Sequence, residues 1–241
     1  MQLRMSPMAD VNDPRESKDW LPVLTFGSVA LPGTMTYQDF LVEFNKVMRE
    51  QTKVLCFTRD DPSMTPDSPP DLYGWGYAHS RMWDRYGDGH RGVCLIFDID
   101  SLGDEVAQSV GTRGELLHTG VSYFNYPPGE SDAFTMSTDD IAARGVAGAL
   151  VAHRSAHHGV LYFYKAVDWQ SENELRWILF SDHADRWEYI SIERSLAGVI
   201  FGVDCSGDEI RRIRWLLRKR HDMKFATMQF RNGHPIPILL P

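Results

Sequence analysis

The sequence predicts an α+β fold in a single domain, 1–241, with a mixed central sheet flanked by helices. Helix-like and strand-like segments follow one another along the chain, but without the strict alternation of α/β proteins. The 241 residues fall within the roughly 100–250 residues that one domain accommodates. With 43% hydrophobic and 24% charged residues, the composition is that of a globular chain and excludes a mainly disordered one.

The first half of the chain carries clear helix, strand and loop signals. Residues 36–51 are predicted to form a helix, because Thr36 can cap it and apolar side chains then recur at helical spacing. The apolar run at 54–57 predicts a short buried strand. The segment 60–71 holds four Pro and four Asp and therefore predicts a surface loop. The elements expected next are a helix around 80–86 and a central strand at 92–99.

The second half continues with two helices among several apolar runs. An Ala-rich helix is predicted at 139–156, capped by Asp139 or Asp140. Ser206 and Glu209 have the spacing of a capping box, which opens a helix to about residue 220. Strands are predicted at 160–164, 175–180, 199–203 and 224–230, followed by an extended tail at 235–241.

Charge and composition exclude some classes of function. A formal net charge of −8 argues against non-specific nucleic-acid binding, which depends on neutralising phosphates. The basic segment 206–224 is either a solvated helix face or a surface for a specific anionic partner. No apolar run approaches the roughly 20 residues that span a bilayer, so no membrane partner is expected. The chain start lacks an apolar signal region, which predicts a cytoplasmic protein; the oligomeric state is left open.

The segment 81–92 is the first candidate for function. It places Trp83, Tyr86 and His90 beside two glycines just before a strand, where ligand-binding groups are common. The alternative is that Trp83 and Tyr86 pack into the core while His90 caps the turn.

The segment 165–177 is the second candidate, with Lys165, Trp169, Glu172, Glu174 and Arg176. On a strand, Glu172 and Glu174 would point to the same side, and two carboxylates in one pocket would raise the pKa of one of them. That arrangement suits an acid–base or ribose-orienting pair. The alternative is a surface strand on which Glu174 and Arg176 neutralise each other.

A third segment carries His153 and His157, one helical turn apart, a spacing that can chelate a metal ion. No third ligand follows nearby, so the interpretation preferred is of helix-end histidines that interact with the C-terminal dipole, and no metal is predicted.

Taken in order, three motifs resemble an uncharacterised, mostly bacterial family, domain of unknown function 2971. They are the strand at 54–58, the segment 82–94 and the segment 165–176. The family's Asn-Asp-Pro motif stands here at 12–14. Family members usually carry a further strand before that motif, so the resemblance implies that an N-terminal strand is missing and that 3–6 are the remains of the next one.

The order of these motifs also resembles that of ADP-ribosyltransferases, in which a late Glu-x-Glu opens a strand. The analogy implies NAD as a cofactor, with Glu174 on the nicotinamide ribose and Glu172 activating the acceptor. Trp83 or Tyr86 would stack on the nicotinamide, and Arg59 or Arg4 would meet the pyrophosphate. An enzyme of a bacterial defence or toxin system is therefore one hypothesis.

Two other hypotheses belong to different classes. A non-catalytic sensor or interaction module would bind a small-molecule or nucleotide ligand, or another anion, with the same segments. A nuclease or hydrolase would use His90 with Glu172 or Glu174. The candidate catalytic residues are Glu172, Glu174 and His90, and the candidate ligand-binding residues are Arg59, Trp83, Tyr86, Lys165, Trp169 and Arg176.

Overall fold

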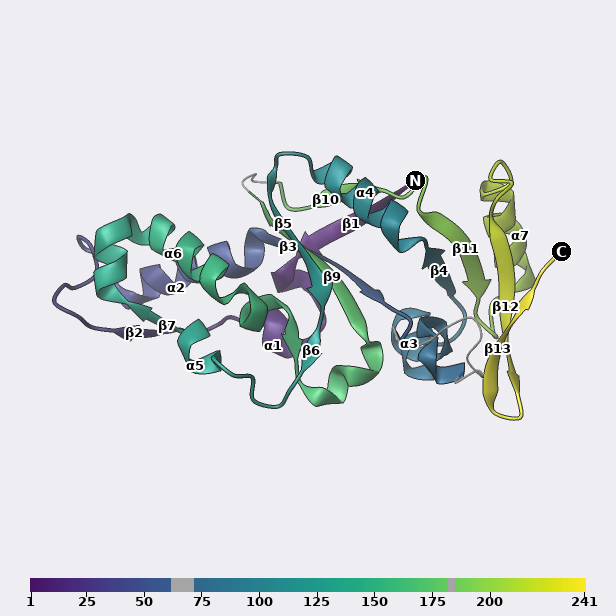
Figure 1. Ribbon diagram of the computed structural model, residues 1–241, viewed down its shortest axis with the longest axis horizontal. Coiled ribbons are helices and arrows are strands. Elements are labelled where there is room, and N and C mark those ends of the chain that lie inside the picture. Colours follow the sequence, from purple (N-terminus) through teal and green to yellow (C-terminus); the bar gives the residue numbers. More distant parts are fainter. Residues whose placement is uncertain (62–71, 182–184) are drawn as a thin grey trace.

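The computed structural model describes residues 1–61, 72–181 and 185–241, so most of the predicted loop 60–71 lies outside the described residues. Two main sheets and a set of helices confirm the α+β prediction. A five-stranded sheet lies in the middle of an elongated molecule, with α2 (Tyr37–Asn45) and α6 (Thr138–Tyr162) at one end and a four-stranded sheet at the other (Figure 1).

The five-stranded sheet has the order β10-β1-β3-β9-β5, and all its pairs are antiparallel. The predicted mixed pairing lies instead in the four-stranded sheet, β13-β12-β11-β4, where β11 and β12 are parallel. The cause is α7 (Gly207–Leu216), since a helical crossover returns the chain in the same direction. The strands are β1 (Gln2–Pro7), β3 (Thr52–Thr58), β4 (Val93–Phe97), β5 (Gly114–Gly120), β9 (Glu174–Ser181), β10 (Glu188–Ser191), β11 (Leu196–Phe201), β12 (Lys224–Arg231) and β13 (His234–Leu239).

Strand β9 separates two hydrophobic clusters. Trp177 and Leu179 belong to the cluster shared with β11 and α4 (Ile99–Val110). Ile178 and Phe180, which alternate with them, belong to the cluster shared with α2 and α6. Because strand side chains alternate, Glu174 and Arg176 share the α6-facing side of the sheet.

Several predicted elements are confirmed with shifted bounds. The strand predicted at 92–99 forms as β4, but it is the edge strand of its sheet and not a central one. Thr36 and Asp39 form a capping box on α2, and α3 (Ser80–Tyr86) has the predicted extent. The strand predicted at 160–164 is wrong, because α6 continues to Tyr162 and only β8 (Tyr164–Lys165) follows. Ser137, and neither Asp139 nor Asp140, caps α6.

The remaining elements are short and connect the layers. The predicted tail at 235–241 pairs with β12 as β13, and residues 3–6 lie in β1, paired with β10 and β3. The short elements are η1 (Met8–Asp10), α1 (Pro14–Ser17), β2 (Val23–Thr25), the π-turn η2 (Lys46–Glu50), η3 (Leu72–Gly74), η4 (Gly76–Ala78), β6 (Ser122–Tyr123), α5 (Glu130–Ala133), β7 (Thr135–Ser137) and η5 (Val167–Glu172). Within the described ranges, no helix is both long and apolar enough to cross a bilayer.

Candidate functional site

The start of β9 lies in a buried cluster of five charged side chains, which we call the ion network: Glu16, Lys165, Glu172, Glu174 and Arg176. None is more than 5% exposed. Arg176 Nε lies 2.5 Å from Glu174 Oε1 and its Nη2 lies 3.1 Å from Oε2, a bidentate pair. The same guanidinium donates to both Glu16 oxygens at 2.6 and 3.0 Å. Arg176 is thus held between two carboxylates.

Lys165 joins the two glutamates of the Glu-x-Glu sequence. Its Nζ lies 2.8 Å from Glu172 Oε2 and 2.8 Å from Glu174 Oε2. The prediction that both glutamates lie on one strand is wrong, because Glu172 ends η5 and only Glu174 belongs to β9. They meet at Lys165 because Asn173 between them adopts a left-handed conformation with φ 41°, which asparagine tolerates well.

Glu172 connects the ion network to the molecular surface. The Tyr86 hydroxyl donates to Glu172 Oε1 at 2.7 Å, and Tyr86 is 51% exposed. Arg85 Nη1 lies 3.6 Å from the same oxygen. The Arg85 guanidinium and the Lys165 ammonium both lie over the Trp169 ring, at 4.2 and 4.7 Å from its centroid. The structure therefore brings together Tyr86, Lys165, Trp169, Glu172, Glu174 and Arg176.

The electrostatics of the ion network keep Glu174 ionised. Burial raises the pKa of Glu174, but Arg176 and Lys165 outweigh burial and lower that pKa to about 2. Burial lowers the pKa of Lys165, but Glu174 and Glu16 outweigh it and the pKa is raised. The carboxyl group whose pKa is raised is that of Glu16, because burial raises this pKa more than Arg176 lowers it. Glu174 is thus a charged hydrogen-bond acceptor without a proton to donate near neutral pH.

Trp83 and His90 pack elsewhere, on the four-stranded sheet. Trp83 is 4% exposed and its Nε1 donates to the Tyr77 carbonyl at 2.7 Å. His90 stacks on Trp83 with ring centroids 6.5 Å apart and contacts the Phe230 ring edge-on at 6.1 Å. Among the described residues, no hydrogen bond, ion pair or ring contact joins His90 to Glu172 or Glu174. This geometry favours the alternative for Trp83, which packs into the core, but not for Tyr86, which is half exposed and bonds Glu172.

Arg59 lies beyond the end of β3 and is tied to the Glu-x-Glu segment through Asn173. Arg59 Nε donates to Asn173 Oδ1 at 3.1 Å, and Asn173 Nδ2 donates to the Arg59 carbonyl at 3.0 Å. The guanidinium lies against Gly120, where a Cβ would come within 2.6 Å of Arg59 Nη1. From there Arg59 lines a cavity of about 700 Å³.

Three residues of the site were not among the candidates predicted from the sequence: Glu16, Arg85 and Asn173. A local signal for Glu16 exists, because the Asp13 side chain caps α1 at Arg15 N and Pro14 occupies the first turn. The Asn-Asp-Pro motif therefore starts the short helix that carries Glu16 into the ion network.

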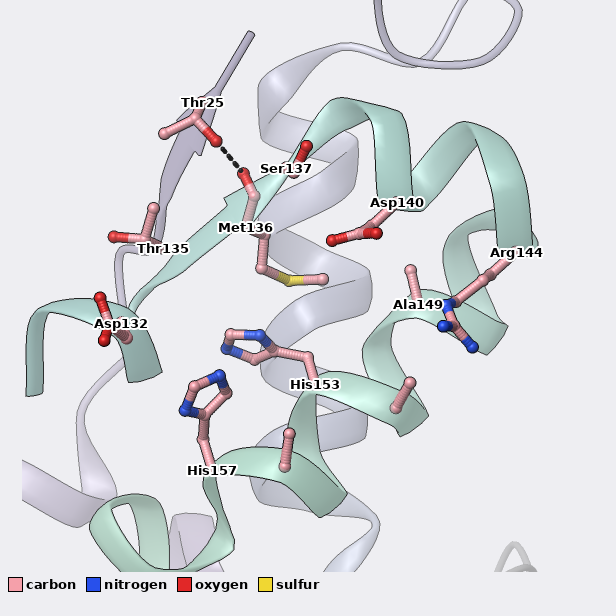
Figure 2. A pocket seen from close by; sticks show the side chains of 12 residues that line it. Thr25, Asp132, Thr135, Met136, Ser137, Asp140, Arg144, Ala149, His153 and His157 are labelled. Carbon is pink, nitrogen blue, oxygen red and sulfur yellow. Dashed lines mark hydrogen bonds between the residues drawn. The ribbon is translucent and has the colours of Figure 1, made fainter. Parts of the chain in front are cut away.

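The histidine pair lines a separate pocket of about 480 Å³ beside α6 (Figure 2). The His153 and His157 rings lie 4.5 Å apart, and Asp140 and Arg144 line the same pocket. His153 lies well inside α6 and its Nε2 is 2.9 Å from the Ala133 carbonyl, so the helix-end interpretation does not apply to it. Within the described residues, no group of three His, Cys, Asp or Glu side chains could hold a metal ion.

Comparison with known proteins supports the family resemblance. Residues 82–177 match the model of the family described as Protein of unknown function (DUF2971). The matched segment contains most of α3, all of β5 and α6, and the start of β9. No curated protein and no solved structure matches the chain.

Proposed function

We propose that this protein is a non-catalytic module that binds a nucleotide or another anionic ligand, and that the ion network is its scaffold. The observation that carries the proposal is that both oxygens of both glutamates are engaged by the protein itself. Glu172 Oε1 accepts from Tyr86 and Oε2 from Lys165. Glu174 Oε1 and Oε2 both accept from Arg176, and Oε2 also pairs with Lys165.

A catalytic carboxylate has to offer an oxygen to the substrate, as a base, an acid or a hydrogen-bond acceptor. Glu174 is only 4% exposed, so offering an oxygen to a substrate would require its side chain to turn away from Arg176 and Lys165. Breaking a buried ion pair by removing one partner costs about 3–5 kcal/mol, so substrate binding would have to supply a comparable free energy. The arrangement therefore suits a scaffold that fixes its neighbours better than it suits an acid–base pair.

Binding of an anion is supported by the cations that the scaffold positions. Asn173 holds Arg59 at the edge of the cavity between the sheets, and Glu172 holds Arg85 beside Trp169 at the surface. Arginine next to aromatic rings is a common way to recognise phosphate groups attached to flat bases.

The second candidate is an ADP-ribosyltransferase-like, NAD-using enzyme of a bacterial defence or toxin system. One observation favours it: Tyr86 is half exposed and its hydroxyl bonds Glu172, so one end of the ion network reaches the surface. In that role Glu174 would accept a hydrogen bond from the ribose. Its contact with Lys165 would have to break for the substrate to take that place.

Incubation with NAD separates the two candidates. We expect the wild-type protein to release no nicotinamide over hours, because its glutamates are already engaged, while nucleotide binding is detectable by calorimetry. Nicotinamide release that disappears in Glu174→Gln, with Glu115→Gln on the exposed face of β5 as the matched control, would instead establish the enzyme.

A further inference from the structure

A cavity of about 700 Å³ lies between the two main sheets. Its walls come from β3, β4, β9, β11 and α4, for example Phe57, Leu95, Leu175, Ile200 and Ile99. Leu175 lies on the face of β9 opposite to Glu174, since neighbouring strand residues alternate. The cavity is therefore a site apart from the ion network.

Much of the surface that lines this cavity is apolar, although solvent reaches it. Leu95 is 36% exposed and Ile99 is 47% exposed, although both line the concave space. The volume falls within the roughly 300–1,000 Å³ of small-molecule sites, which combine apolar walls with a few polar groups. When a ligand displaces water from apolar walls of this kind, the free energy of binding becomes more favourable.

The polar and charged residues of the lining are Thr58, Arg59, Asp60, Asp98 and His118. Asp98 Oδ1 accepts from the Ser101 amide at the start of α4 at 2.9 Å. Asp60 is occupied, because its Oδ1 accepts from the Gly76 amide at 2.8 Å. Thr58 Oγ1 is buried and has no hydrogen-bond partner among the described residues, which is uncommon for an interior hydroxyl. Arg59 is anchored at Nε by Asn173, so its terminal nitrogens keep a fixed position.

An aromatic pair completes the lining. The rings of Trp75 and Tyr77 are nearly parallel, 9° apart, with centroids separated by 6.0 Å. Both line the cavity beside Gly76, where a Cβ would lie 3.2 Å from the Arg59 carbonyl. Flat aromatic surfaces next to an arginine offer stacking and charge recognition together.

We propose that this cavity binds a flat heteroaromatic ring that carries one anionic group, a nucleoside monophosphate in class. The ring occupies the apolar space between the sheets near Trp75 and Tyr77, and the phosphate pairs with Arg59. This inference rests on the proposed binding function and assigns it a site and a ligand class.

Titration calorimetry with AMP, adenosine and inorganic phosphate tests the assignment. We expect Arg59→Gln to weaken AMP binding about tenfold or more, as loss of a charge-assisted hydrogen bond does, and to leave adenosine binding nearly unchanged. Arg212→Gln, which removes the same charge from the exposed face of α7, is the matched control and should bind AMP as the wild type does.

A second variant tests the space itself. Leu95→Trp fills the cavity from an already exposed position and should abolish binding of both AMP and adenosine, whereas Leu216→Trp on exposed α7 should not. Equal AMP affinity in Arg59→Gln, Leu95→Trp and the wild type would overturn the assigned site while leaving the binding function in place. Failure of AMP and adenosine to bind the wild type overturns the ligand class. NAD cleavage by the wild type overturns only the non-catalytic function.

Discussion

Asn173 shows how much depends on one residue in this molecule. Its left-handed backbone separates two glutamates that both bind Lys165, and its side chain holds Arg59 at two points. A single position thereby connects the ion network on one face of β9 to the cavity on the other.

Glu174 is the residue whose charge the fold depends on most directly. Its pKa falls from 4.5 to about 2 on folding, so the stabilisation from its ionised form is complete above pH 4.5 and is lost as pH falls toward 2. We expect Glu174→Gln to lower the free energy of unfolding by about 3–5 kcal/mol at pH 7, because Arg176 and Lys165 lose a buried counter-charge. The deficit should shrink between pH 4.5 and pH 2.

Urea denaturation at a series of pH values measures this deficit. Glu115→Gln is the matched control, since Glu115 is exposed on β5, and it should leave the free energy of unfolding nearly unchanged. A deficit that stays constant from pH 7 to pH 3 would show that the loss comes from packing rather than from the charge of Glu174.

At the scale of elements, local signals in the sequence located those structures that local interactions determine. The N-cap residues Thr36 and Ser206 marked the starts of α2 and α7, and the apolar runs predicted β3, β4 and β11. The helix α4 was not predicted, although its Asp98 cap and amphipathic pattern are local signals for it.

Local signals could not predict which residues pair with one another inside the site. Glu16 lies 160 positions before Arg176, and only tertiary folding brings them together. The sequence pattern did indicate the density of charge at 165–176, but it could not show that each charge would be neutralised inside the molecule. Likewise, the inter-sheet cavity depends on how β4 and α4 face β9, which no single segment encodes.

The helix α6 bends at Gly145. Gly145 has φ 71° and ψ 162° inside the helix, a region that essentially only glycine occupies. We expect Gly145→Ala to lower the free energy of unfolding by about 1–3 kcal/mol. The cause is backbone strain and not a steric clash, because no atom lies within 4 Å of the added Cβ. Gly148→Ala, three residues later in the helix, should instead stabilise by about 0.5–1 kcal/mol. Thermal unfolding of both variants measures these changes. Equal changes in stability in the two variants would contradict backbone strain at Gly145.

At the scale of the whole molecule, residues of both sheets line one cavity, so a ligand there would contact both. A ligand that binds only the folded protein also raises its stability according to its concentration and affinity. Such a ligand should affect β4 and β11 in one sheet and β3 and β9 in the other, and leave the distant end with α2, α6, β2 and β7 unchanged (Figure 1).

Hydrogen exchange with and without saturating AMP tests this coupling. We expect slower exchange in β4 and α4 together with the start of β9, since these elements line the occupied space. Exchange in α6 around the histidine pocket should not change, because that pocket lies against β7 and α5 rather than against either wall. The Arg59→Gln variant at the same AMP concentration should show little protection. Protection confined to one sheet would mean that the ligand sits on a single surface, and protection around His153 would move the binding site to the other pocket.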